Sequence, residues 1–254
     1  MTSKEKWQFT NRVISDNSYE TYLELGTSDI FRPGCTFYNI VCPKKVSVDI
    51  GARSHYQMSF RDFFRDLDAG VLDNEKRSHR TVQTQPVLYN YDCIFNGVTP
   101  TSHTDTKDCM NSSLKVLNNK GSLIFPYVDP LSKSWQTEGK DRHPEWIGPV
   151  WKSMVEIHYN PTALVDVVIV HNHNNPDGIT HGLAIIRKID PRNKQLVDIK
   201  KKLCQSFSDK FLTFKLYESN KREIMNIVNM NTFFDKYGTF EDHMSASYKF
   251  WSKK

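Results

Sequence analysis

The sequence lacks the features that would place it among secreted, membrane-bound or disulfide-rich proteins. Its five cysteines are odd in number and form no C-x-x-C pair, so we expect reduced thiols in a cytosolic-type compartment. The longest apolar run, 167–170, is too short to span a bilayer, and the polar start predicts no secretory or membrane segment. No Gly-, Ser- or Pro-rich linker divides the 254 residues, which predicts a single domain.

Motifs that bind nucleotides or build common hydrolase sites are also missing. The sequence contains no G-x-G-x-x-G after a strand, no P-loop and no G-x-S-x-G. The net charge of +5 is mild, and its densest basic cluster, 200–202, falls on an expected helix. That placement favours a solvated helix face over a nucleic-acid site. We therefore expect neither a membrane nor a specific nucleic acid as a partner.

Hydrophobic patterning predicts more strands than helices, without strict alternation between them. Helices are expected at the N-terminus and at 19–25, 59–70, 195–207 and 221–234. Strands are expected at 36–41, 46–50, 86–95, 114–117, 123–127, 150–159, 164–170, 183–189 and 211–217. This order predicts an α+β fold, in which an antiparallel β-sandwich core is flanked by outer α-helices and an N-terminal helix projects to dock on a neighbour.

The clearest helix signal lies at 59–70. Ser59 is a suitable N-cap, Asp62 stands three residues later as in a capping box, and Gly70 is placed to end the helix. Phenylalanines and a leucine form one apolar face between these two ends. The segment is therefore predicted to pack one side against a core.

Two histidines follow the apolar run at 167–170. His171 and His173 would lie on the same face of a strand end, which suits two zinc ligands. The stretch resembles the metal-binding core of the JAMM metalloproteases, His-x-His, seven residues, Ser, two residues, Asp. Here the Ser position is His181 and the Asp position is Ala184. Because the third ligand is missing, no metal site is expected. His171, His173 and His181 remain as candidates beside the simpler interpretation of a hairpin turn.

Other titratable residues point less clearly to chemistry. Asp105 and Asp108 stand near His103 in a stretch expected to be a polar loop, where solvation explains them. Cys204 lies off the apolar stripe of its expected helix, and no histidine stands near it in the sequence to activate it. No catalytic residue is predicted, and cofactor-binding residues stay unassigned.

The order of segments resembles the cypovirus polyhedrins, the matrix proteins of viral occlusion bodies. A polar N-terminal helix leads into strands at 34–50, and Ser54-His55-Tyr56-Gln57 and the Phe-rich helix come next. The closest local match is Asp141-Arg142-His143-Pro144-Glu145-Trp146, followed by Ile147-Gly148-Pro149. The resemblance spans most of the chain and is least evident at 219–254.

This resemblance implies a structural protein, not an enzyme. It implies one polyhedrin-like domain, with an N-terminal helical arm at 1–26, a sandwich core with inserted helices at 34–218 and a C-terminal helical extension at 219–254. It further implies homotrimers packed into intracellular crystals around virus particles in the host cytoplasm. No cofactor is expected to be required, although nucleotides held in the lattice are implied.

Alkaline dissolution of such crystals in the insect midgut agrees with the composition. High pH would remove charge from the lysines and ionise the 11 tyrosines, so that packed chains would repel one another. Two alternatives stay open at this point. One is a metal-dependent hydrolase built on the degenerate JAMM-like motif, and the other is a nucleotide- or nucleic-acid-binding module.

Overall fold

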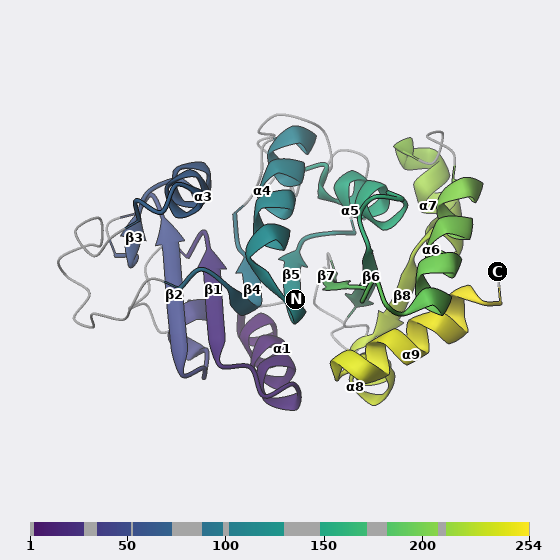
Figure 1. The fold of residues 1–254 in the computed structure, drawn as a ribbon, viewed down its shortest axis with the longest axis horizontal. Helices are drawn as coiled ribbons and strands as arrows, with labels where there is room; N and C mark the ends of the chain where they lie inside the picture. The colour runs from purple at the N-terminus through teal and green to yellow at the C-terminus, as the bar shows by residue number, and fades with distance from the viewer. Residues whose placement is uncertain are drawn as a thin grey trace. The chain divides into compact units, whose positions relative to one another are not determined.

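The computed structural model describes residues 3–27, 35–51, 53–72, 88–98, 102–129, 148–171, 182–207 and 212–253 (Figure 1). The chain divides into two compact units. Unit 1 comprises Met1–Thr99 and Lys107–Ile124, and unit 2 comprises Pro100–Thr106 and Phe125–Lys254. The helix α4, His103–Val116, and the strand β5, Leu117–Pro126, each contribute residues to both. The expected number of domains stays a prediction.

Unit 1 is built on a parallel sheet with the strand order β3-β2-β1-β4-β5. Besides β5, its strands are β1 (Thr21–Leu25), β2 (Lys44–Asp49), β3 (Tyr56–Gln57) and β4 (Tyr91–Asn96). All four neighbouring pairs in this order run parallel. Parallel neighbours need crossover connections, because a tight hairpin returns the chain antiparallel. Unit 1 is therefore a Rossmann-like α/β unit.

The predicted antiparallel β-sandwich is wrong, and misassigned segments explain the error. The expected helix at 19–25 is the strand β1, which is buried along most of its length. The expected strand at 36–41 contains the short helix α2, Thr36–Asn39. The stretch around Asp105 and Asp108, expected to be a loop, lies inside α4. A central parallel strand is covered on both faces, so it does not show the alternation of apolar and polar residues by which a half-exposed strand is recognised in a sequence.

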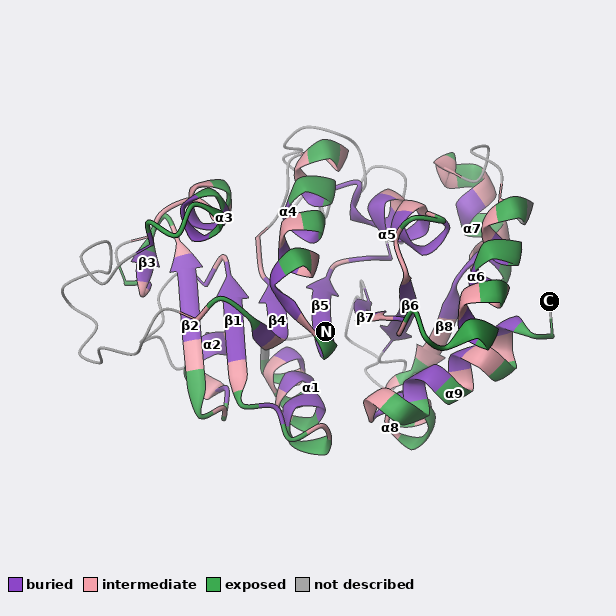
Figure 2. Cartoon of the chain, viewed as in Figure 1, coloured by how far each residue is buried: buried purple, intermediate pink, exposed green. Residues whose placement is uncertain are grey.

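The N-terminal helix α1, Ser3–Asp16, does not project as predicted. Phe9, Val13 and Ile14 are buried, and their spacing places them on one face of the helix. The buried stripe is visible along α1 in Figure 2. The helix therefore packs against the core of its own chain.

The predicted helix at 59–70 is confirmed as α3, Phe60–Asp68. The Ser59 hydroxyl accepts a hydrogen bond from the Asp62 amide at 3.1 Å, which is the predicted N-cap. Gly70 adopts a positive φ of 66° just after the helix, a conformation that favours glycine. Phe63, Phe64 and Leu67 are buried.

Unit 2 contains the strands β6 (Val165–His171), β7 (Leu183–Lys188) and β8 (Asn226–Asn229). The strand β6 pairs antiparallel with β7 and parallel with β8. The helices are α5 (Val150–His158), α6 (Lys194–Ser206), α7 (Phe214–Ile224), α8 (Met230–Tyr237) and α9 (Phe240–Trp251). The predicted strands at 164–170 and 183–189 are confirmed, whereas 150–159 is helix α5 and not a strand.

Two charged side chains stand opposite each other inside unit 2. Asp166 of β6 pairs in register with Arg187 of β7, and both are buried. Arg187 donates hydrogen bonds to the carbonyl oxygens of Tyr237, Gly238 and Thr239 between α8 and α9. These contacts fix the corner where the two C-terminal helices meet.

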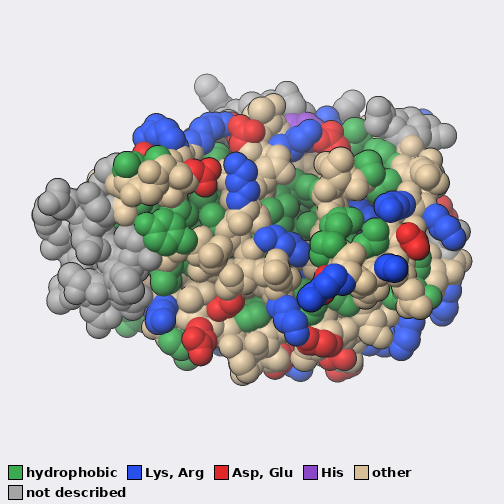
Figure 3. All heavy atoms as spheres, in the orientation of Figure 1, with side chains coloured by type: hydrophobic (Ala, Val, Ile, Leu, Met, Phe, Trp, Pro, Cys, Tyr) green, Lys and Arg blue, Asp and Glu red, His purple; other side chains and the backbone are tan. Residues whose placement is uncertain are grey.

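One face of the molecule is mixed in charge over the residues that the structure describes. On the face drawn in Figure 3, Lys and Arg side chains are interspersed with Asp and Glu. Among the helices described, none combines the length and the apolar character needed to cross a bilayer.

Candidate functional site

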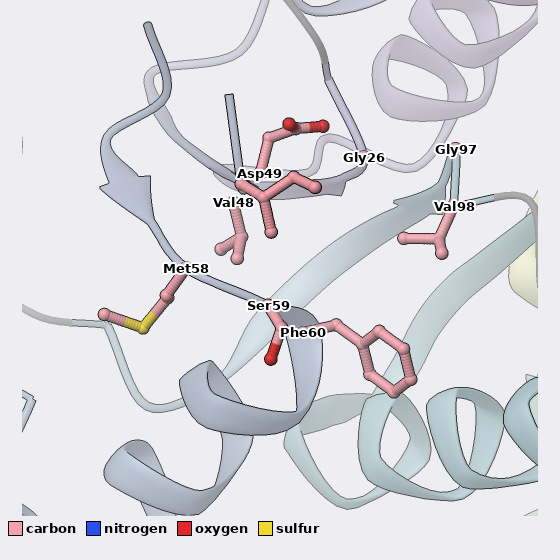
Figure 4. Close-up of a pocket in the computed structure, with 9 residues that line it drawn as sticks. Gly26, Val48, Asp49, Met58, Ser59, Phe60, Gly97 and Val98 are labelled. Atoms are coloured by element: carbon pink, nitrogen blue, oxygen red, sulfur yellow. The ribbon is translucent and has the colours of Figure 1, made fainter. Parts of the chain in front are cut away.

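A pocket of about 320 Å³ opens at the carboxyl ends of three strands of unit 1 (Figure 4). The residues that line it come from the ends of β1, β2 and β4 and from the segment that enters α3: Gly26, Val48, Asp49, Ile50, Met58, Ser59, Phe60, Gly97 and Val98. The strand order reverses between β1 and β4, because the chain builds β2 and β3 on one side of β1 and β4 and β5 on the other. Ligands of open parallel sheets bind in such a place.

Two glycines form the back of this pocket. A Cβ atom on Gly26 would lie 2.6 Å from the backbone nitrogen of Val98, and one on Gly97 would lie 2.9 Å from the Gly26 carbonyl oxygen. Gly26 also has a positive φ of 75°. The amide of Gly97 donates to the Leu25 carbonyl at 2.7 Å. The turns after β1 and β4 are therefore in contact through their backbones, and any side chain at either position would separate them.

Asp49 supplies the acidic group of the pocket. It is the last residue of β2, and its Oδ1 accepts a hydrogen bond from the Gly51 amide at 2.6 Å. Figure 4 shows the carboxylate pointing away from the Phe60 ring. Asp49 is therefore the acidic member of a lining that is otherwise apolar around Phe60 and Met58.

A buried carboxyl group lies two residues before Gly26. Glu24 is 3 % exposed and accepts a hydrogen bond from the Tyr22 hydroxyl at 2.6 Å. Burial raises the pKa of Glu24 to about 8, although the bond from Tyr22 and the amide of Phe37 act in the opposite direction. Glu24 is therefore largely protonated at neutral pH, and it joins β1 to α2 without lining the pocket.

Sequence reasoning missed this site, although signals for it are present. Gly26 directly follows the segment 19–25, which was expected to be a helix but contains the strand β1. Asp49 is the last residue of β2, whose residues 46–48 are buried. A glycine that directly follows one buried strand and an acidic residue at the end of the next are typical of the carboxyl edge of a parallel sheet. That pattern would have indicated Gly26 and Asp49 once the strands were assigned.

His171, a candidate metal ligand from the sequence, stands at the end of β6 in unit 2. Its Nε2 is 3.0 Å from Oδ2 of the buried Asp129, and Lys221 Nζ is 3.1 Å from the same oxygen. Burial opposes ionisation of Asp129, but the hydrogen bond from His171 and the charge of Lys221 hold its pKa below the ordinary value. The arrangement therefore places His171 and Lys221 on one oxygen of a buried carboxylate.

The other two candidates, His173 and His181, lie outside the described residues. Within the part of the chain that the structure describes, no group of three or more His, Cys, Asp or Glu side chains could hold a metal ion. The candidate metal ligands therefore stay predictions. The location in the host cytoplasm also stays a prediction.

Comparison with known proteins gave matches to solved structures but none to a protein-family model or to a curated protein sequence. A methyltransferase from Podospora anserina, crystallised with S-adenosylhomocysteine, is 18 % identical, with a TM-score of 0.43 over 75 % of this chain and 80 % of that one. An O-methyltransferase from Bacillus cereus, also bound to S-adenosylhomocysteine, is 11 % identical, with a TM-score of 0.40 over 73 % and 81 %.

The O-methyltransferase TomG from Streptomyces achromogenes, in complex with S-adenosylmethionine, is likewise 11 % identical, with a TM-score of 0.40 over 75 % of this chain and 82 % of that one. At TM-scores below 0.5, none of these similarities identifies the activity of this chain.

The polyhedrin resemblance and its implications are wrong. That resemblance implies an antiparallel sandwich, whereas the sheet of unit 1 is parallel. The structural role, the homotrimeric crystals around virions, the lack of a cofactor and the lack of enzyme activity followed from the resemblance alone, so these predictions are overturned with it. The alternative of a JAMM-like metal hydrolase is overturned as well. The error arose because order and spacing of segments were compared without correct strand assignments.

Proposed function

We propose that this chain is an S-adenosylmethionine-dependent methyltransferase whose unit 1 holds the methyl donor. The observation that carries the proposal is the pocket at the strand-order reversal, where Gly26 and Gly97 meet and Asp49 closes the neighbouring strand. The pocket's position, its glycine-lined back and its charge each restrict what it binds.

The position and shape favour a nucleoside-containing ligand. In open parallel sheets, an acidic residue near the end of the second strand hydrogen-bonds the ribose hydroxyls of the ligand. Asp49 holds that position in unit 1. The apolar part of the lining, with Met58 and Phe60, offers a surface for a flat base. The missing side chains at Gly26 and Gly97 let the turns after β1 and β4 meet, and these turns form one wall of the pocket.

The pocket does not suit a dinucleotide. A pyrophosphate is bound by a G-x-G-x-x-G turn at the N-terminus of a helix, and the sequence lacks this motif. The only helix between β1 and β2 in the described residues is α2, which has four residues and begins ten positions after Gly26. None of the described residues that line the pocket is Lys or Arg. An adenosine derivative without phosphates fits these walls better than NAD or ATP.

S-adenosylmethionine is such a derivative, and when bound it supplies an electrophilic methyl group. This chain's own contribution is to hold the ribose at Asp49, to seat the base beside Phe60 and to bind the ligand in the pocket that the two glycine turns help to form. These are positioning roles, which account for much of the rate enhancement in group transfer.

Isothermal titration calorimetry with S-adenosylmethionine and S-adenosylhomocysteine tests the proposal. We expect binding by the wild type and a loss of about 10-fold or more in affinity for Asp49→Asn, because hydrogen bonds to a charged group contribute about 1.5–3 kcal/mol. Asp198→Asn, at an exposed carboxylate of α6, is the matched control and should bind as the wild type does. Failure of the wild type to bind either compound, or tighter binding of NAD or ATP, would refute the proposal.

A further inference from the structure

The aromatic member of the pocket lining in unit 1 is Phe60, the first residue of α3. Figure 4 shows its ring beside the start of that helix. Phe60 is only partly buried, so the surrounding protein restricts its rotamer less than it would at a core position. Ordering a side chain when a ligand binds costs free energy. A ring that is already held in one orientation is therefore a better surface for a flat base.

The neighbouring residue Arg61 contacts this ring. Its guanidinium lies over the Phe60 ring, 5.2 Å from the ring centroid. A cation within about 6 Å of a centroid is attracted to the electron-rich face of the ring, and a planar guanidinium also stacks on it. Arg61 is not among the described residues that line the pocket. It therefore acts on a ligand there through Phe60 or through its charge at a distance.

Arg61 is itself held by the helix α4. Its Nη2 lies 3.2 Å from Oδ2 of Asp108. Seven residues later on each helix, Lys115 Nζ and Asp68 Oδ2 form a second ion pair with 3.7 Å between them. All four residues belong to unit 1, as does the pocket lining. Arg61 thus connects the Phe60 ring to a neighbouring helix of the same unit.

We propose that Arg61 holds the Phe60 ring as the surface on which the base of the methyl donor stacks, and that Asp108 keeps Arg61 in place. This inference rests on the proposed methyltransferase function and adds a residue that sets the affinity of its pocket. The guanidinium occupies one side of the ring, and the base occupies the side that faces the pocket. Because Arg61 touches no ligand, it is a positioning residue.

The first test is calorimetric titration of S-adenosylhomocysteine and S-adenosylmethionine into the wild type, Arg61→Met and Asp108→Asn. We expect Arg61→Met to weaken the binding of both ligands by about two- to fivefold, the usual size of an exposed cation–π contact. Asp108→Asn should have a smaller effect in the same direction. Arg12→Met removes the same charge from an arginine that is 55 % exposed, against 54 % for Arg61, and that pairs within its own helix. This control should bind as the wild type does.

A double-mutant cycle separates the two routes by which Arg61 could act. In a Phe60→Leu background, Arg61→Met should change the affinity by less than about 1.5-fold, because the contact that it removes is already absent. An effect of charge at a distance would persist in that background. It would also make Arg61→Met bind S-adenosylmethionine more tightly than the wild type does, because a guanidinium repels the sulfonium.

Salt dependence tests the part played by Asp108. The Arg61 and Asp108 side chains are 54 % and 50 % exposed, so dissolved ions screen their attraction. Adenosine carries no charge, and the effect of salt on its stacking is common to both proteins. We expect its affinity for the wild type to exceed that for Arg61→Met most at low salt, with the ratio falling toward one at about 1 M sodium chloride. A ratio that does not change with salt would overturn the role of Asp108.

The outcomes keep this inference apart from the function on which it rests. If the wild type binds the two S-adenosyl ligands but Arg61→Met binds them within about 1.5-fold of the wild type, the role of Arg61 is overturned and the proposed function stands. An equal loss in the Phe60→Leu background, or tighter binding of S-adenosylmethionine by Arg61→Met, overturns it as well. If the wild type binds neither ligand, the proposed function fails and the role of Arg61 fails with it.

Discussion

Replacing Asp166 with alanine should release α9 from the sheet of unit 2. The Asp166 carboxylate accepts hydrogen bonds from three side chains of α9: His243 Nε2 at 2.8 Å, Ser247 Oγ at 2.5 Å and Trp251 Nε1 at 3.0 Å. These residues are spaced by four, so they share one face of the helix. A single carboxylate therefore fixes the position of the whole C-terminal helix.

The loss of stability follows from the three buried donors that Asp166→Ala would leave without an acceptor. Each of the three donors is buried, and a buried donor without a partner costs about 1–3 kcal/mol. Removing the buried carboxylate also removes the free-energy cost of its own desolvation, so the sum of the three donor costs overestimates the loss of stability. Removal of one partner from a buried charged network typically costs about 3–5 kcal/mol. We expect Asp166→Ala to lower the free energy of unfolding by that amount.

The pH dependence gives an independent check. Burial opposes ionisation of Asp166, but the hydrogen bond from His243 and the neighbouring histidines outweigh it and hold its pKa well below the ordinary value. A carboxyl group whose pKa is depressed in the folded state contributes stability above its unfolded pKa of about 3.9, and this is lost as the pH falls below that value. The difference in free energy of unfolding between the wild type and Asp166→Ala should therefore shrink in acid.

Urea unfolding, followed by far-UV circular dichroism and by tryptophan fluorescence, measures both effects. Asp198→Ala, at an exposed carboxylate, should stay within about 0.5 kcal/mol of the wild type. The reasoning is refuted if Asp166→Ala changes the free energy of unfolding by less than about 1 kcal/mol. It is also refuted if the difference between the two proteins is the same at pH 3 and pH 7.

Three further predictions concern other sites. Gly97→Ala should lower the free energy of unfolding by about 1–3 kcal/mol and remove S-adenosylhomocysteine binding, because the added Cβ would lie 2.9 Å from the Gly26 carbonyl oxygen. Gly70→Ala is the control, because a Cβ at Gly70 would have no heavy atom within 4 Å, and calorimetry should show that this variant still binds S-adenosylhomocysteine. Burial raises the folded-state pKa of Glu24 to about 8, so the wild type should lose stability as the pH rises from about 4.3 to 8. Glu24→Gln does not ionise, so urea titrations should show it gaining stability relative to the wild type over that range. Tyr159→Phe removes the 2.7 Å hydrogen bond to the Ile224 carbonyl and should lower the free energy of unfolding by about 0.5–1.5 kcal/mol in the same assay. An unchanged free energy of unfolding would show that this bond contributes nothing to stability.

Local signals in the sequence predicted some elements of the fold correctly. The helix α3 was recognised because its cap at Ser59, its apolar face and Gly70 all lie within a dozen neighbouring residues. The strands β6 and β7 were recognised from short apolar runs. These signals depend on residues close together in the chain, and they hold whatever surrounds them.

The sheet and the candidate site depended on tertiary structure. The strand β1 looks like a short helix in isolation, because nothing near it in the sequence shows that β2 and β4 lie on either side of it. Asp49 and Gly97 are nearly fifty residues apart in the chain, and they come to line the same pocket only because the strand order reverses there.

The sequence by itself determined the composition, the strongest caps and apolar runs, and the lack of a dinucleotide-binding motif. Tertiary structure alone decided that the sheet is parallel, that Gly26 and Gly97 face each other, and that Arg61 pairs with Asp108. The physical reason is that caps and apolar patterns act over a few residues, whereas strand pairing and side-chain clusters join distant residues through long-range packing.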